Sequence, residues 1–343
     1  MDPKWLLLAA LFLGGPTSAQ EAGDAEVVEP AAGAAGTDDG IVEFDTVVVS
    51  GLQPGPGLWK VSKGDNTLHI LGTLSPLPRR MEWVSAEVEA VIAGSQEVIG
   101  PPSISMRSGL GMFRSMLLLP SLLKVRRNPD GRTLEQSVPP ELYARWKPLK
   151  ARYIGGDRGI ERWRPIFAAQ ELYEAAMRES GLTQDGVVQK TVARAAKRSK
   201  VRITPVDLEL VVEDPKAAIR EFRAGPLADT DCFAKTLTRI ETDLDAMRQR
   251  ANAWAVGDIE ALRALPYDNQ YSACIRAITK TGLARRLGID DAHRRAADAW
   301  VAAAEQTLAN NASSFATLPM SLLLSPDGYL ATLQAKGYAI QAP

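Results

Sequence analysis

A pair of short strands is the clearest pattern in the chain. Apolar and β-branched residues run from Leu58 to Lys63 and again from Thr67 to Leu71. Between them lies Gly64-Asp65-Asn66, where glycine tolerates a positive φ and the Asp and Asn side chains bond their own backbone. Pro76 and Pro78 follow, and proline cannot donate to a strand ladder. The pattern predicts a β-hairpin with a sharp exit.

Apolar residues at helical spacing mark much of the remaining chain. They predict helices over Met81–Ala93, Pro139–Arg152, Glu161–Ser180, Gln184–Ser199, Ala217–Arg223, Asp229–Ala255, Asp258–Leu265, Asp290–Asn310 and Asp327–Lys336. Short β-branched or continuously apolar runs predict further strands over Glu97–Ile99, Val201–Val206, Ser313–Leu324 and Tyr338–Ile340.

The most apolar internal stretch runs from Met106 to Val125, interrupted by Arg114 and Pro120. We expect a pair of core helices, or a lid over a cleft. The alternative is a membrane-surface helix, because basic residues (Lys124, Arg126 and Arg127) follow the apolar run directly.

A β-branched run at residues 43–51 precedes the hairpin. The favoured interpretation is an edge strand of the domain sheet. The alternative rests on Asp45–Val49, which resembles the TonB box of outer-membrane receptors and would make a TonB-type protein a partner through strand addition.

The amino terminus has the organisation of an export signal. Lys4 precedes an apolar run, and small residues end at Ala19, near which we expect cleavage. The apolar run is too short to cross a membrane. Residues 20–40 are acidic and rich in Ala and Gly, which predicts a disordered linker. We therefore expect a periplasmic or secreted protein without a transmembrane segment in its mature chain, with one domain over residues 41–343.

Composition adds two limits. The 343 residues are 45% hydrophobic and carry a net charge of −1, which suits a globular protein and does not favour nucleic-acid binding. The two cysteines, Cys232 and Cys274, form a disulfide in one interpretation and remain buried free thiols in the other.

The hairpin and the carboxyl-terminal residues together resemble a known family. The hairpin ending in Gly72-Thr73, and a tail with Asp327-Gly328 and Gly337-Tyr338, are similar to the TraB/GumN family, which includes the Tiki-type metalloproteases. The resemblance implies an α/β (α+β) fold. Its central mixed β-sheet would be built from N- and C-terminal segments and covered by many α-helices.

The same resemblance implies a metal site made from two GxxH histidines and a glutamate. Ser75 stands at the first histidine, Leu322 at the second, and Pro101 at the glutamate, while Gly72 and Thr73 of the first motif are kept. A hydrolytic metal site needs several converging ligands and an open position for water. These positions therefore predict a divergent member with a degenerate site, without a metal or another cofactor.

Other catalytic arrangements find little support in the sequence. Ser75 has no GxSxG context. No spacing marks Glu82, Asp207 and Asp327 as a cation site, and Asp207 would suit a helix N-cap. His69 is expected to be half-buried on its strand, and His293 to lie on an exposed helix surface.

The sequence thus favours a non-catalytic binding or accessory protein of the cell envelope, a pseudoenzyme whose partner is an unknown envelope protein or polysaccharide. The polysaccharide rests on the family's association with exopolysaccharide gene clusters. The alternative is a metal-dependent hydrolase or peptidase with relocated ligands.

Overall fold

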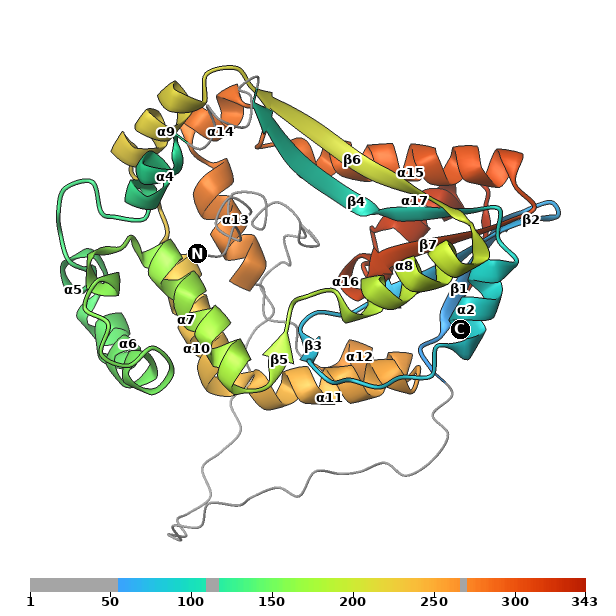
Figure 1. Cartoon of the computed structure of the whole chain (residues 1–343), viewed down its shortest axis with the longest axis horizontal. Helices are drawn as coiled ribbons and strands as arrows, with labels where there is room; N and C mark the ends of the chain where they lie inside the picture. Colours follow the sequence, from blue (N-terminus) through green and yellow to red (C-terminus); the bar gives the residue numbers. More distant parts are fainter. Residues whose placement is uncertain (1–54, 109–116, 266–269) are drawn as a thin grey trace, which may run out of the picture.

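The computed structural model describes residues 55–108, 117–265 and 270–343 (Figure 1). Its centre is a six-stranded mixed sheet with the strand order β6-β4-β7-β2-β1-β8. The strands are β1 (Leu58–Lys63), β2 (Asn66–Thr73), β4 (Glu97–Ser108), β6 (Arg202–Val212), β7 (Ser313–Pro319) and β8 (Ala339–Gln341). A second, two-stranded sheet joins β3 (Leu77–Pro78) to β5 (Leu182–Thr183). The predicted α/β fold with a mixed central sheet is confirmed.

The two ends of the described chain meet in the middle of the large sheet. β1 and β2 form the predicted antiparallel hairpin, and β8 adds to the other side of β1. β2 pairs in parallel with β7, from Thr67 opposite Ser313 to Thr73 opposite Pro319. β4 and β6, from the middle of the sequence, extend the sheet in parallel. Parallel pairing places the carboxyl ends of β2 and β7 side by side.

Helices form most of the described chain outside the strands. They are α2 (Ala86–Ala93), α4 (Leu119–Val125), α5 (Leu134–Ser137), α6 (Pro140–Tyr153), the 3-10 helix η2 (Ile160–Arg162), α7 (Pro165–Glu179), α8 (Val187–Ser199), α9 (Pro215–Ala224), α10 (Thr230–Thr242), α11 (Leu244–Ala255), α12 (Ile259–Ala264), α13 (Gln270–Thr279), α14 (Gly282–Arg286), α15 (Ala292–Asn310), α16 (Met320–Leu323) and α17 (Tyr329–Ala335).

The apolar side chains of these helices form two large clusters. One lies around the sheet, where α15 packs along one side and the pair α2 and α8 along the other (Figure 1). The other joins α5, α6, α7 and α10 to the start of α11, away from the sheet. Indole rings are central to both: Trp254 and Trp300 are buried in the first cluster and Trp146 in the second.

Several predicted boundaries are wrong. β6 continues beyond the predicted end at Val206 to Val212. β4 does not end at Ile99 but continues to Ser108, because a register shift between Ile99 and Pro102 accommodates the prolines as a bulge. Met106 therefore belongs to a strand and not to a helix. The predicted strand Ser313–Leu324 ends at Pro319 and turns into α16.

The predicted helix Asp229–Ala255 is two helices that meet at Asp243. Asp243 lies at the boundary, and its carboxylate forms ion pairs with two buried arginines, Arg239 at 3.5 Å and Arg250 at 2.6 Å. α13 and α14, which follow, were not predicted.

Of the two interpretations of the cysteine pair, the structure has the disulfide. Cys232 of α10 is bonded to Cys274 of α13, and both cysteines are buried.

Several predictions lie outside the described residues. They are the export signal, the linker over residues 20–40, the run at residues 43–51 and the first half of the apolar stretch that leads to α4. Within the described ranges, none of the helices combines the length and the apolar character needed to span a bilayer.

Candidate functional site

The carboxyl ends of β2 and β7 form the edge of the sheet where the sequence places a degenerate metal site. Thr73 is the last residue of β2 and pairs with Pro319, the last residue of β7. Ser75 follows one strand and Leu322 the other. The topology therefore brings the two segments to one edge of the sheet, even though they are far apart in the sequence.

Apolar side chains fill the space at this edge. A Cβ atom added to Gly72 would overlap the sulfur of Met320 and lie 3.1 Å from Leu323 and 3.2 Å from Trp59. Trp254 closes the same place from α11, because its indole Nε1 donates a hydrogen bond of 2.7 Å to the Gly72 carbonyl. Because Gly72 has no side chain, hydrophobic groups pack directly against its backbone.

The three candidate ligand positions have different environments. Leu322 is buried in α16, Ser75 is exposed, and Pro101 is half-buried inside β4. Next to Pro101, the Gly100 carbonyl accepts a hydrogen bond of 2.9 Å from the Trp300 indole. None of these side chains is a ligand that a hydrolytic zinc site uses. The residues at this edge therefore do not fit the family's metal.

Acidic and imidazole groups elsewhere do not replace those ligands in the described part of the chain. No three or more His, Cys, Asp or Glu side chains gather there as a metal-binding group. Glu82 lies before α2, and Asp327 before α17. Asp207, which would suit a helix N-cap, instead lies within β6 and accepts hydrogen bonds from Ser103 and Ser105 of β4.

The two histidines lie on different elements. His69 is half-buried on β2, as predicted, and burial followed by the nearby Lys60 charge lowers its pKa. His293 was expected on an exposed surface, which is wrong. It is half-buried near the start of α15, its Nε2 atom is buried, and burial lowers its pKa.

Glu97 is a buried carboxylate at the opposite, amino-terminal end of β4. It accepts hydrogen bonds from Arg202 at 2.7 Å, from Thr204, and from Thr307 and Asn311 at 3.3 Å each. Burial would raise the pKa of Glu97, but these bonds and the Arg202 charge outweigh it and lower that pKa. Both carboxylate oxygens of Glu97 accept hydrogen bonds from residues of the fold, so Glu97 has a structural role.

Comparison with known proteins decides the family. The model of the TraB/PrgY/gumN family matches residues 57–342. The chain belongs to this family. Its match begins just before β1 and ends after β8, so it spans the whole central sheet. A search of curated proteins and a search of solved structures each gave no match.

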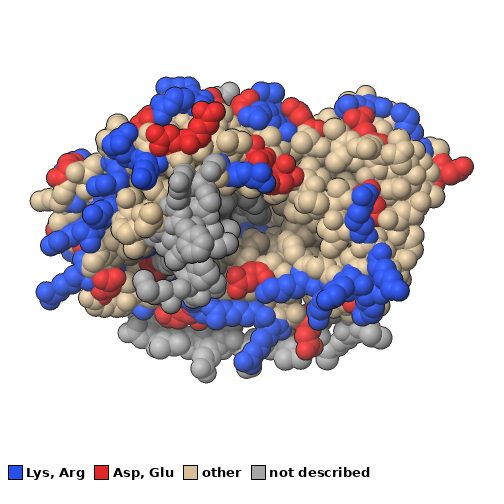
Figure 2. Space-filling view, turned by 45° about the horizontal axis from the view of Figure 1, so that its top comes forward, with Lys and Arg blue, Asp and Glu red and all other residues tan. Residues whose placement is uncertain are grey.

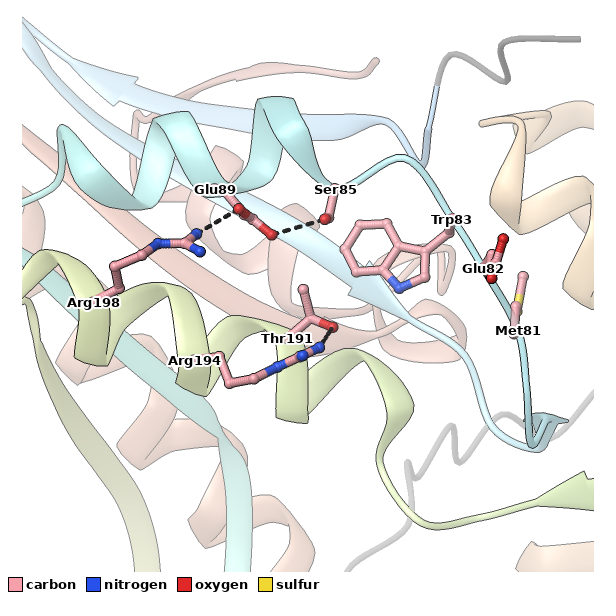
Figure 3. Close-up of a pocket in the computed structure, with 8 residues that line it drawn as sticks. All are labelled: Met81, Glu82, Trp83, Ser85, Glu89, Thr191, Arg194 and Arg198. Atoms are coloured by element: carbon pink, nitrogen blue, oxygen red, sulfur yellow. Dashed lines mark hydrogen bonds and ion pairs between the residues drawn. The ribbon is translucent and has the colours of Figure 1, made fainter.

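This TraB/PrgY/gumN protein has a hollow beside the strand-end site. The hollow has a volume of about 420 Å³ and lies between the loop before α2, the start of α2, and α8 (Figure 3). It is lined by Met81, Glu82, Trp83, Ser85, Glu89, Thr191, Arg194 and Arg198. Trp83 contacts Trp254 edge to face, with ring centroids 5.3 Å apart, and Trp254 bonds the Gly72 carbonyl. Two indoles therefore separate the hollow from the filled site.

The charged groups in the hollow are unevenly paired. Glu89 accepts hydrogen bonds from the Ser85 hydroxyl at 2.9 Å and from Arg198 at 2.5 Å, and these two donors lower its pKa. Arg194 instead donates to the Thr191 hydroxyl at 3.2 Å and to the Lys190 carbonyl at 3.3 Å. Among the described residues Arg194 forms no ion pair, although its charge also helps to lower the pKa of Glu89 (Figure 3). Its guanidinium is therefore held less tightly than that of Arg198.

The sequence did not reveal this hollow. The predicted helix from Met81 included the loop that forms its wall, whereas α2 begins only at Ala86. A usable signal was present in α8, where Thr191, Arg194 and Arg198 recur at spacings of three and four residues and so share one helix face.

Proposed function

We propose that this protein is an exported, non-catalytic binding or accessory protein of the cell envelope, with a single domain over residues 41–343. In this proposal it keeps the TraB/PrgY/gumN scaffold and has lost the metal site. The observation that carries the proposal is the packing at Gly72, where Met320, Leu323 and Trp59 occupy the space at the strand ends.

Physical chemistry supports the loss of metal-dependent hydrolysis. Such a reaction needs an open coordination position for water next to converging ligands. At this edge Met320, Leu322 and Leu323 of α16 are buried and apolar. A newly formed site here would require these groups to leave a packed core, which costs several kcal/mol for large side chains.

Export has two lines of support. The amino-terminal sequence has the features of a secretory signal ending near Ala19. The bond between Cys232 and Cys274 suits an oxidising compartment, since cytosolic thiols are normally kept reduced.

The hollow beside α2 and α8 is the place where we propose that the protein binds its partner. It offers an indole from Trp83 and a cation from Arg194, so it suits a polar ligand with an apolar face. An envelope polysaccharide or a peptide segment of an envelope protein has this chemistry.

The first experiment is a titration of the mature protein with Zn²⁺, Mn²⁺ and Co²⁺, followed by calorimetry and by thermal unfolding. We expect no stoichiometric binding. A His69→Ala/His293→Ala variant controls for adventitious binding to the two histidines. One tightly bound equivalent per chain, with Tm raised by about 5 °C or more, would support the alternative hydrolase with relocated ligands and overturn the proposal.

A second measurement tests the hollow. Purified envelope polysaccharide is titrated into the protein and into the Trp83→Ala and Arg194→Ala variants. Arg158→Ala, at an exposed loop position, is the matched control. We expect binding that only the hollow variants weaken. Equal binding by every variant would place the ligand elsewhere.

A further inference from the structure

Exposed apolar side chains gather at one end of the molecule. In the described ranges the large hydrophobic residues with the most exposure are Leu117 at 74%, Val211 at 57%, Leu123 at 47% and Ile203 at 43%. The first three lie where α4, α9 and the far end of β6 come together (Figure 1). Exposed leucines of this kind mark an interaction surface when they occur together.

The segment at α4 presents an amphipathic outer face. Leu117, Pro120, Leu123 and Lys124 are all exposed and recur at helical spacing. The exposed Arg127 follows just after α4, where it forms a β-bridge with Trp163. Leu118, by contrast, is buried, at 7% exposure. The outward face therefore begins with leucines and ends with cations.

The neighbouring helix α9 adds a basic stripe. Lys216, Arg220 and Arg223 are exposed and separated by four and three residues, so they share one face. α9 packs against α4, and none of its residues is buried.

The cations at this end are largely uncompensated. Lys124, Arg127, Lys216, Arg220 and Arg223 form no ion pair in the described chain, whereas Arg286 is paired with Glu221. Exposed acids next to these cations in the sequence are Glu213, Asp214 and Asp130. Asp214 caps α9 through the Ala217 amide, and Asp130 is paired with Arg132. Figure 2 shows basic side chains along the left end of the molecule, the end to which α4 and α9 belong in Figure 1.

We propose that this basic leucine surface (Leu117, Leu123, Lys124 and Arg127 beside Lys216, Arg220 and Arg223) docks the protein on an anionic lipid bilayer. Leucine side chains enter the boundary between headgroups and acyl chains, while Lys and Arg extend to the phosphates. An acidic protein partner would match the charge, but two widely exposed leucines next to cations suit the layered chemistry of a bilayer surface.

The docking inference does not depend on the state of the metal site. It uses a surface remote from the strand ends and from the hollow, so metal titration and membrane binding can succeed or fail separately. Membrane docking would place the hollow close to envelope components while leaving it open.

The test uses the full mature chain and sedimentation with vesicles of phosphatidylcholine alone or mixed with phosphatidylglycerol. We expect binding to the anionic vesicles only, weakened as salt rises. Lys216→Glu/Arg220→Glu should lower the partition coefficient by at least about 25-fold, because the loss of each surface cation alone accounts for about fivefold. Leu117→Ser/Leu123→Ser should lower it about tenfold, through lost apolar burial.

Two matched controls lie elsewhere on the protein. Ile203→Ser removes an exposed apolar side chain at the other end of β6, and Lys190→Glu/Lys197→Glu reverses two exposed cations on α8. Both should bind like the wild type, with unchanged unfolding curves for all variants. Absence of binding to anionic vesicles at low salt, or equal losses in the controls, would overturn the proposal. Binding to an acidic protein but not to vesicles would overturn it as well.

Discussion

The packing of Met320 requires a glycine at position 72. The absent side chain of Gly72 leaves a space on β2, and the Met320 sulfur fills it. A glycine at position 72 is therefore needed for packing, whether or not this edge of the sheet binds a metal.

We predict that Gly72→Ala destabilises the protein by about 2 kcal/mol, because overpacking forces neighbouring side chains from their rotamers. Urea unfolding measures the change. Gly156→Ala is the control, since nothing lies within 4 Å of a Cβ at that position. A Gly72→Ala protein as stable as the control would contradict the packing described.

Glu97 illustrates a residue whose charge serves the fold. Its pKa lies below the ordinary value of 4.5, so its stabilising effect is complete above that value and is lost as pH falls through the lowered pKa. Its four donors would lose their shared acceptor if the carboxylate were removed.

Glu97→Gln should cost about 2 kcal/mol at pH 7, the scale of hydrogen bonds to a charged group. The difference from the wild type should shrink as the pH falls below 4.5. Urea unfolding across this range measures it, with Glu82→Gln as an exposed control. A pH-independent difference would show that the charge is not involved.

At the scale of elements, the sequence predicted the existence of strands better than their ends. The hairpin and β8 were placed within two residues, because turn chemistry and glycine mark them. The sequence predicts that β4 ends at Ile99, before its prolines. In the structure β4 continues past Ile99 by pairing with β6, and a bulge accommodates the shift in register. Tertiary pairing of this kind leaves no local signal.

The sequence likewise predicts part of the candidate site and misses the rest. The family resemblance implies that Ser75 and Leu322 belong to one site, and the parallel pairing of β2 with β7 brings their two segments to the same edge of the sheet. The sequence could not predict that Met320 and Trp254 close over Gly72, since those contacts join residues distant in sequence.

One carboxylate, that of Asp243, links α10 to α11 through ion pairs with an arginine of each helix. Asp243→Ala would leave the buried Arg239 and Arg250 without it, and we predict a loss of about 3 kcal/mol. Asp245→Ala, whose partner Arg248 is exposed, should change stability by less than about 0.5 kcal/mol. Thermal and urea unfolding compare the two. Equal effects would contradict a special role for Asp243.

At the scale of the whole molecule, export makes a direct prediction. Expressed with its complete amino terminus in a secretion-competent bacterial host, the protein should be recovered outside the cytoplasm with Gln20 as its first residue. Mass spectrometry of the intact protein measures the cleavage site. A charged replacement in the apolar run, Leu8→Arg, should retain it in the cell. An uncleaved chain in the cytoplasm would contradict the export proposal.

The pairing of β2 with β7 also sets the order of events during synthesis. β2 is made well before its parallel neighbour, which begins only at Ser313. During translation, the middle of the sheet has to wait until all the residues between these two strands have been made. A chain that cannot complete its sheet early stays unfolded long enough to be threaded through a narrow pore, so this late-closing topology is suited to a protein that folds only after crossing a membrane.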